Sequence, residues 1–158
     1  MVSFLYRRSH PRIFEVGQHP DGTLRDWMRF DLLPLAPDVL AVRMDSALNF
    51  LTAAILEQFI TDRCGTNPQL RRVILCANGV NDSDATGTET LESLHRNLKA
   101  AGIDFYASAV KKQVWDVLYR ARLIAAMGVD HLFATDAHAI PALQAGIFNE
   151  ARSSHLQS

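Results

Sequence analysis

The sequence has few of the residues that mark disulfide-rich or zinc-binding proteins. Its 158 residues include two cysteines, Cys64 and Cys76, and they form neither a CxxC pair nor a Cys/His combination with the spacing of a zinc site. Cys76 lies in an apolar run and is expected to be buried, whereas Cys64 is expected in a polar loop. This cysteine usage favours a reducing compartment.

Long apolar runs are also missing. The N-terminus has no apolar stretch of the kind that forms a secretory signal. Runs such as 123–127 are much shorter than the ~20 residues that a membrane-spanning helix needs. The sequence therefore predicts no transmembrane helix within these residues.

Charge and histidine content narrow the functional classes further. Lys and Arg number 16 against 17 Asp and Glu, a formal net charge of -1, which argues against a nucleic-acid partner. Among the six histidines, His131 and His138 are separated by a strand end and a loop, with no carboxylate or thiol to complete a metal site. His95 is expected to face solvent. We therefore predict neither a metal nor a cofactor.

Apolar residues recur with the alternating periods of an α/β domain. Strands are expected at 13–16, 39–44, 72–77, 104–110 and 131–134. Helices are expected after Asn49, from Thr86 to Gly102, over 114–128, and from Thr135 or Asp136. Pro141 implies that the last helix begins later, near 138, or is kinked. This order predicts a mostly parallel central sheet with about four packed helices; residues 18–37 are rich in turn residues.

The most informative segment connects the strand at 72–77 to the following helix. It contains Asp82, Ser83, Asp84, Ala85, Thr86 and Gly87. The pattern Thr86-x-x-Glu89 is that of a capping box, and a helix N-terminus favours a bound anion or phosphate. The simpler alternative is an ordinary cap, because Asp, Ser and Thr are common in strand-to-helix loops. The loop lacks the GxxxxGK[ST] pattern of nucleotide hydrolases.

The stretch Asp84-Ala85-Thr86-Gly87 resembles the D-[SA]-[ST]-G signature of STAS domains. Blocks at 8–17, 42–50, 102–103, 114–118 and 128–133 resemble further blocks of the STAS domains of SulP anion transporters, although Thr52 replaces a frequent Asn. The resemblance implies the STAS (anti-sigma factor antagonist-like) α/β fold. In anti-sigma factor antagonists of this superfamily the hydroxyl residue before the glycine accepts a phosphate, which makes Thr86 the phosphoacceptor candidate within a regulatory or binding loop at 82–87.

The same resemblance implies an arrangement and a role. Residues 1–11 would be the linker from a membrane domain, 12–150 the STAS domain and 151–158 a flexible tail. Arg7, Arg8 and Arg12 suit the cytoplasmic flank of a membrane span. The chain would be a non-enzymatic regulatory domain on the cytoplasmic side of an inner or plasma membrane, in a transporter of sulfate, bicarbonate or another anion. Its partners would be the membrane domain, a cytosolic regulatory protein and, as a further candidate, a nucleotide; the parent is expected to be a homodimer.

Several alternatives stay open or are disfavoured. A free-standing anti-sigma factor antagonist, acting as a Ser/Thr phosphorylation switch, is the main alternative, and a nucleotide-binding module is a third. A serine hydrolase is disfavoured because Ser83 is not in a GxSxG motif. Trp115 and Tyr119 are expected to pack in the core or at its margin, and Lys111 and Lys112 to lie on a solvated face.

Overall fold

The computed structural model describes residues 12–21, 23–26 and 32–155, with side chains described through residue 145. The predicted linker at 1–11 lies outside this part of the chain. The predicted inward position of Ile147 lies outside the described side chains. All statements below concern the described residues.

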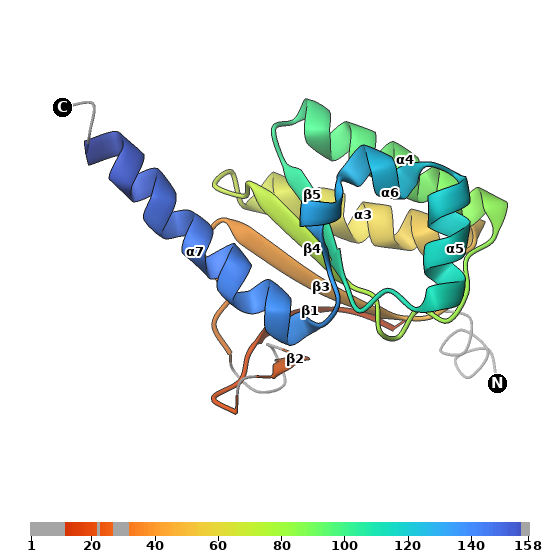
Figure 1. The fold of residues 1–158 in the computed structure, drawn as a ribbon, viewed down its shortest axis with the longest axis horizontal. Coiled ribbons are helices and arrows are strands. Elements are labelled where there is room, and N and C mark those ends of the chain that lie inside the picture. The colour runs from red at the N-terminus through yellow and green to blue at the C-terminus, as the bar shows by residue number, and fades with distance from the viewer. Residues whose placement is uncertain (1–11, 22, 27–31, 156–158) are drawn as a thin grey trace.

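One six-stranded sheet forms the centre of the fold, with the strands in the order β2-β1-β3-β4-β5-β6 (Figure 1). The strands are β1 (Arg12–Gln18), β2 (Leu24–Asp26), β3 (Val39–Asp45), β4 (Arg72–Cys76), β5 (Asp104–Ser108) and β6 (Leu132–Phe133). Strands β3 to β6 are parallel neighbours, whereas β1 runs antiparallel to both β2 and β3. The mostly parallel sheet is therefore confirmed, with β2 as an additional strand in the segment predicted to be rich in turns.

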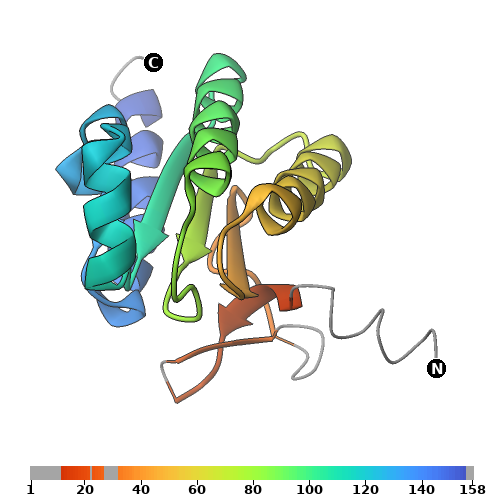
Figure 2. The ribbon, with the colours of Figure 1, turned by 90° about the vertical axis from the view of Figure 1, so that its right-hand side faces the viewer.

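In the described part of the chain five α-helices pack on the sheet, where about four were predicted. They are α3 (Phe50–Thr66), α4 (Ala85–Ala100), α5 (Lys112–Arg120), α6 (Leu123–Met127) and α7 (Asp136–His155). Buried residues of α3 to α6 share one core with one face of the sheet, while α7 contributes to a second core on the other face. Figures 1 and 2 show this division, with α3 and α4 on the side of the sheet opposite α7.

Strand β4 explains why its sequence is a continuous apolar run. Val73 and Leu75 belong to the core beneath α3 to α6, and Ile74 and Cys76 belong to the core beneath α7. A central strand covered on both faces needs apolar side chains at successive positions. The buried position predicted for Cys76 is confirmed, and burial raises the pKa of its thiol to about 12.

The predicted single helix over 114–128 is wrong, because the structure divides this segment into α5 and α6. The break occurs at Arg122, whose φ of 65° is left-handed and cannot continue an α-helix. Glycine or asparagine usually occupies such a position, so the sequence contains no signal for this break. The division lets the buried Leu118 and Leu123 belong to two short elements that both face the core.

The last helix begins at Asp136 and runs through Pro141 to His155. The backbone N–H of His138 donates to the hydroxyl oxygen of Thr135 at 3.2 Å, as expected of a helix cap. The alternative in which the helix begins near 138 is therefore wrong, while a kink at Pro141 stays a prediction. The helix also includes residues 151–155, which the sequence assigned to a flexible tail.

Two smaller expectations are corrected by packing. His95 is buried, with 9% of its surface exposed, rather than facing solvent. Burial, together with the neighbouring Lys99, lowers the pKa of its imidazole. Cys64 lies in the last turn of α3 and is partly buried against the core, because that helix extends to Thr66.

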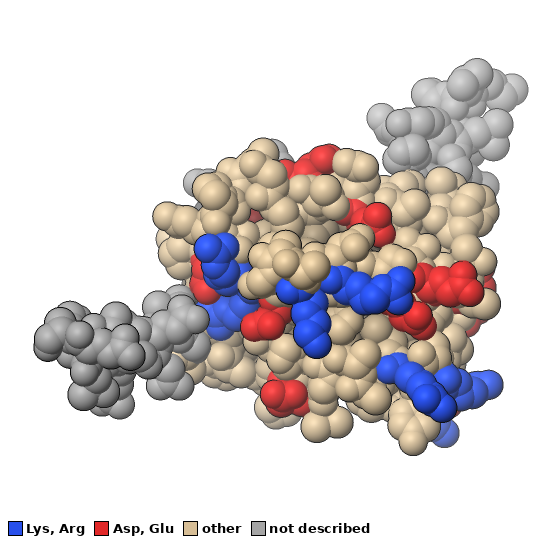
Figure 3. Space-filling model, turned by 90° about the horizontal axis from the view of Figure 1, so that it is seen from above, with Lys and Arg blue, Asp and Glu red and all other residues tan. Residues whose placement is uncertain are grey.

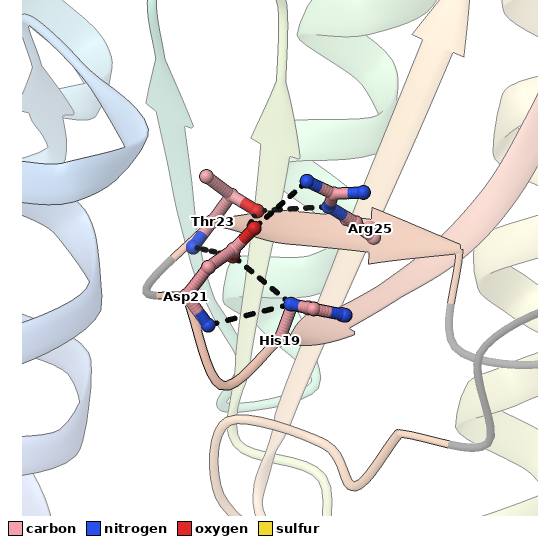
Figure 4. A network of polar contacts seen from close by, with 4 residues as sticks. All are labelled: His19, Asp21, Thr23 and Arg25. Carbon is pink, nitrogen blue, oxygen red and sulfur yellow. Dashed lines mark hydrogen bonds and ion pairs between the residues drawn. The ribbon is translucent and has the colours of Figure 1, made fainter.

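A polar network closes the turn between β1 and β2 (Figure 4). The carboxylate of Asp21 accepts hydrogen bonds from the backbone N–H and the hydroxyl of Thr23, at 3.0 and 2.6 Å. It also forms ion pairs with Arg25 at 2.8 Å and, when the imidazole is protonated, with His19 at 3.1 Å. The hydrogen bonds from Thr23 hold the pKa of Asp21 well below its usual 3.8. The network lies in the turn that connects β1 to the unpredicted strand β2.

Candidate functional site

The predicted loop lies at the carboxyl edge of the parallel strands, where β3 and β4 end and α3 and α4 begin. Leu48, which follows β3, holds the loop by two backbone hydrogen bonds. Its N–H donates to the carbonyl of Asp82 at 2.8 Å, and its carbonyl accepts from the N–H of Asp84 at 3.0 Å. This short parallel bridge fixes residues 82–84 in an extended conformation beside the start of α3.

Asp84, rather than Thr86, is the N-cap of α4, so the predicted helix start and capping box are both wrong. Its carboxylate oxygen accepts the backbone N–H of Gly87 at 2.7 Å, and the helix begins at Ala85. Thr86 is the second residue of the helix, and its carbonyl accepts the Thr90 hydroxyl at 3.0 Å. Both Asp84 and Thr86 are good cap residues, and the backbone bridge to Leu48 decides between them.

Gly87 allows α4 to touch the chain that leads into α3. A Cβ atom at this position would lie 2.5 Å from the carbonyl oxygen of Leu48 and 2.9 Å from the backbone nitrogen of Asn49. Any larger residue would push the two helix starts apart. The glycine of the signature therefore has a packing role between the two helix starts.

Ser83 is not accessible, although it belongs to the predicted binding loop. It is 5% exposed, and its hydroxyl lies 2.8 Å from that of Thr88, which is 3% exposed. The Thr88 hydroxyl also contacts the carbonyl oxygen of Asp84 at 2.9 Å. The two buried hydroxyls thus form a hydrogen bond with each other beneath the loop, which stabilises its conformation.

The accessible part of the loop consists of Asp82, Asp84, Ala85 and Thr86, all of which are exposed. The Thr86 hydroxyl stands in the first turn of α4, where the unpaired backbone N–H groups favour negative charge. The carboxylates of Asp82 and Asp84 in the same loop would repel any further negative charge placed there. The arrangement presents a reachable hydroxyl on an acidic surface.

The start of α5 supports the same loop from the other side. The Lys111 ammonium donates to the side-chain oxygen of Asn81, and the Gln113 amide donates to the Asn81 carbonyl at 3.1 Å. Lys111 therefore anchors the loop rather than only facing solvent, while Lys112 is exposed as predicted.

The sequence did not identify the apolar side chains that border the loop. Phe50 and Leu51, in the first turn of α3, are 66% and 45% exposed. The helical spacing of Leu51, Ile55 and Phe59 predicts one buried apolar face, but Leu51 is exposed. Asn49 accepts the N–H groups of Leu51 and Thr52 at 3.0 Å, and the Thr52 hydroxyl accepts the Asn49 N–H at 2.9 Å. Thr52, which departs from the family pattern, thus completes a reciprocal cap.

The aromatic pair on α5 behaves differently at its two positions. Trp115 is partly buried and packs against the main core, as predicted. Tyr119 is 67% exposed, so its predicted packing is wrong. The two lie on successive turns, but α5 ends at Arg120 and leaves Tyr119 at its open end.

A cavity of about 150 Å³ lies at the opposite, amino edge of the parallel strands, between the end of α3 and the segment before β3. Glu15 and Arg63 line it, with 3.8 Å between the closest carboxylate and guanidinium atoms. Burial raises the pKa of Glu15 above its usual 4.5, and the Arg63 charge offsets this only in part.

The raised pKa predicts that replacing Glu15 by Gln will stabilise the fold at neutral pH. A carboxyl whose pKa rises on folding contributes stability only below its unfolded pKa, and that contribution is lost as the pH rises through the folded value. The increase in the free energy of unfolding caused by Glu15→Gln should therefore become smaller as the pH falls toward 4.5. Urea unfolding at about pH 5 and about pH 7.5 measures it, with the exposed Glu89→Gln as control. An equal effect at both pH values would contradict the prediction.

Other features of the described residues set limits on the kind of site. Within them, no helix has the length and apolar character needed to cross a membrane. No group of three potential metal ligands occurs in the same residues. The face that carries α4 and α6 has a band of Lys and Arg interspersed with Asp and Glu (Figure 3), so neither sign of charge covers it.

The fold and the loop thus define an α/β domain with an exposed threonine at the start of a helix on the carboxyl edge of its sheet. Residues 33–139 match the STAS domain family. The chain therefore belongs to the STAS domain family, and the predicted fold is confirmed.

The similar proteins include transporters and anti-sigma factor antagonists. Sulfate transporter 1.2 of Arabidopsis thaliana is 23% identical over 94% of this chain and 24% of its own length. This chain thus spans about a quarter of the length of that curated relative.

Solved structures extend the comparison. The murine Solute Carrier 26 family member A9 anion transporter aligns with a TM-score of 0.76 and 18% identity over 91% of this chain and 24% of its own. The SulP transporter STAS domain of Vibrio cholerae aligns with a TM-score of 0.60 and 21% identity, over 77% of this chain and 93% of its own. A putative anti-sigma factor antagonist of Thermotoga maritima aligns with a TM-score of 0.58 and 16% identity, over 68% of this chain and 88% of its own.

Proposed function

We propose that the chain is the regulatory STAS domain of a SulP-type transporter of sulfate, bicarbonate or another anion, on the cytoplasmic side of the membrane. The observation that carries this proposal is the match of nearly the whole chain to about a quarter of a sulfate transporter. The domain couples transport to cytosolic partners and catalyses no reaction. The exposure of Asp82, Asp84 and Thr86 in one loop supports a binding surface at this edge.

The genomic reading frame upstream of Met1 tests this proposal. A continuous frame that encodes membrane-spanning segments is the expected result. A ribosome-binding site directly before Met1, without such segments, would contradict it and would favour the second candidate, a free-standing anti-sigma factor antagonist. That candidate is supported by the similar fold of an anti-sigma factor antagonist and by the hydroxyl at position 86.

Thr86 is the proposed phosphoacceptor. Its exposure makes it reachable by a kinase, whereas Ser83 and Thr88 are buried. A phosphate would add roughly two negative charges beside Asp82 and Asp84, and a partner that docks on the uncharged hydroxyl would be expelled.

Phosphorylation is measured by intact mass after incubation of the chain with cognate cell extract and ATP. We expect the mass of one phosphoryl group on the wild type and none on Thr86→Val. Phosphate on both proteins would place the site elsewhere, and the absence of phosphate on the wild type would end the switch proposal without affecting the docking surface.

A further inference from the structure

The strand register shows at which edge of the sheet the first strand begins. Arg12, the first residue of β1, pairs with Asp45, the last residue of β3. Because β1 is antiparallel to β3, its start lies at the carboxyl edge, where the loop at 82–87 also lies. Strand β1 therefore begins, at Arg12, on the same edge as this loop and away from the cavity that contains Glu15.

The same edge carries an exposed surface of defined chemistry, which we call the carboxyl-edge surface: Phe50, Leu51, Asp82, Asp84 and Thr86. The contact of Gly87 with Leu48 and Asn49 places the first turns of α3 and α4 side by side. Phe50 and Leu51 are large apolar side chains in contact with solvent.

The carboxylates of this surface are not neutralised within the domain. In the part of the chain that the structure describes, neither Asp82 nor Asp84 takes part in an ion pair. Each uses one oxygen to accept a backbone N–H of its own loop, at 2.8 and 2.7 Å. An apolar pair beside two unpaired carboxylates is complementary to a polypeptide that presents Lys or Arg next to a large apolar side chain.

Membrane proteins have such segments on their cytoplasmic side, because the loops that connect their spans are enriched in Lys and Arg. We propose that the carboxyl-edge surface binds a basic cytoplasmic loop of the parent's membrane domain. The proposal rests on the proposed function and specifies the partner of that site. It places the carboxyl edge toward the membrane and the amino edge, with its exposed Leu33, away from it.

Phosphorylation of Thr86 should act on this basic partner in the opposite direction from its effect on a partner that docks on the neutral hydroxyl. A phosphate would increase the negative charge of the carboxyl-edge surface and strengthen its attraction to a basic loop. Modification would therefore tighten the contact between the two domains while it expels a partner that needs the neutral hydroxyl.

Photo-crosslinking in the full-length parent, in its native membrane, tests the proposal. Benzoylphenylalanine replaces Phe50 in one protein and Leu33 in the other; these residues are 66% and 82% exposed at opposite edges of the sheet. We expect Phe50 to crosslink to Lys- or Arg-rich loops of the membrane domain, identified by mass spectrometry, and Leu33 to give no such product. Asp82→Lys should reduce the Phe50 crosslink by about fivefold, as should high salt.

Each other outcome would overturn the inference. Equal crosslinking from both positions, or products only with a soluble protein or a second STAS domain, would assign the surface to another partner. An Asp82→Lys protein with an undiminished crosslink would remove the charge argument. These failures differ from that of the proposed function, which would appear as the absence of a membrane domain in the reading frame.

Discussion

Replacement of Gly87 by Val should lower the free energy of unfolding by at least ~3 kcal/mol, a large fraction of the stability of a typical domain. The new Cβ would lie 2.5 Å from the carbonyl oxygen of Leu48, and neither backbone can yield without separating α3 from α4. The effect is measured by urea unfolding, with the backbone hydrogen bonds of Leu48 followed by hydrogen exchange.

Gly65 provides a matched control for this prediction. It also lies in a helix, but a Cβ there would have no neighbour within 4 Å. Gly65→Val should therefore change stability by no more than about 0.5 kcal/mol. Equal losses for the two variants would show that helix propensity, rather than the contact with Leu48, determines the effect of Gly87→Val.

Replacement of Arg72 by Ala should cost about 2–3 kcal/mol, because it breaks a largely buried ion pair and leaves the partner charge uncompensated. The Arg72 guanidinium lies 3.0 Å from the carboxylate of Asp38 and also donates to the carbonyl of Leu143 at 2.5 Å. It thus ties the start of β4 to the segment before β3 and to α7. Urea denaturation gives the free energy directly.

A double-mutant cycle with Asp38→Ala separates the ion pair from other effects. We expect the two substitutions to be clearly less than additive, since the second removes a charge that the first has already left unpaired. The exposed pair of Arg25 and Asp21 is the control, and Arg25→Ala should cost clearly less than Arg72→Ala. Strict additivity for Arg72 and Asp38 would contradict this account of the pair.

Most of the sheet could be predicted because its central strands have simple patterns. The apolar run at 72–77 and the alternation in 39–44 correspond to β4 and β3, whose faces both packing layers cover. In contrast, β2 has only three residues, and the break between α5 and α6 occurs at the left-handed Arg122. A three-residue strand is too short to show a periodic pattern, and arginine is not a residue that usually adopts a left-handed conformation.

The candidate site was also predicted only in part from the sequence. The position of the loop between a buried strand and a helix followed from the sequence. The start of the helix did not, because Asp84 and Thr86 are both suitable caps and only the bridge from Leu48 distinguishes them. The exposure of Phe50 could not be predicted either, because a single apolar residue at the start of a helix does not show whether it faces the core or solvent.

Uptake of labelled sulfate by the full-length parent, compared between wild type and Thr86→Glu, most directly tests whether this domain regulates a transporter through its carboxyl edge. With equal amounts of protein in the membrane, we predict that the rate for Thr86→Glu will differ by about fivefold or more, whereas the distant Leu33→Ser will leave it unchanged. Rates that are the same in all three proteins would contradict the account.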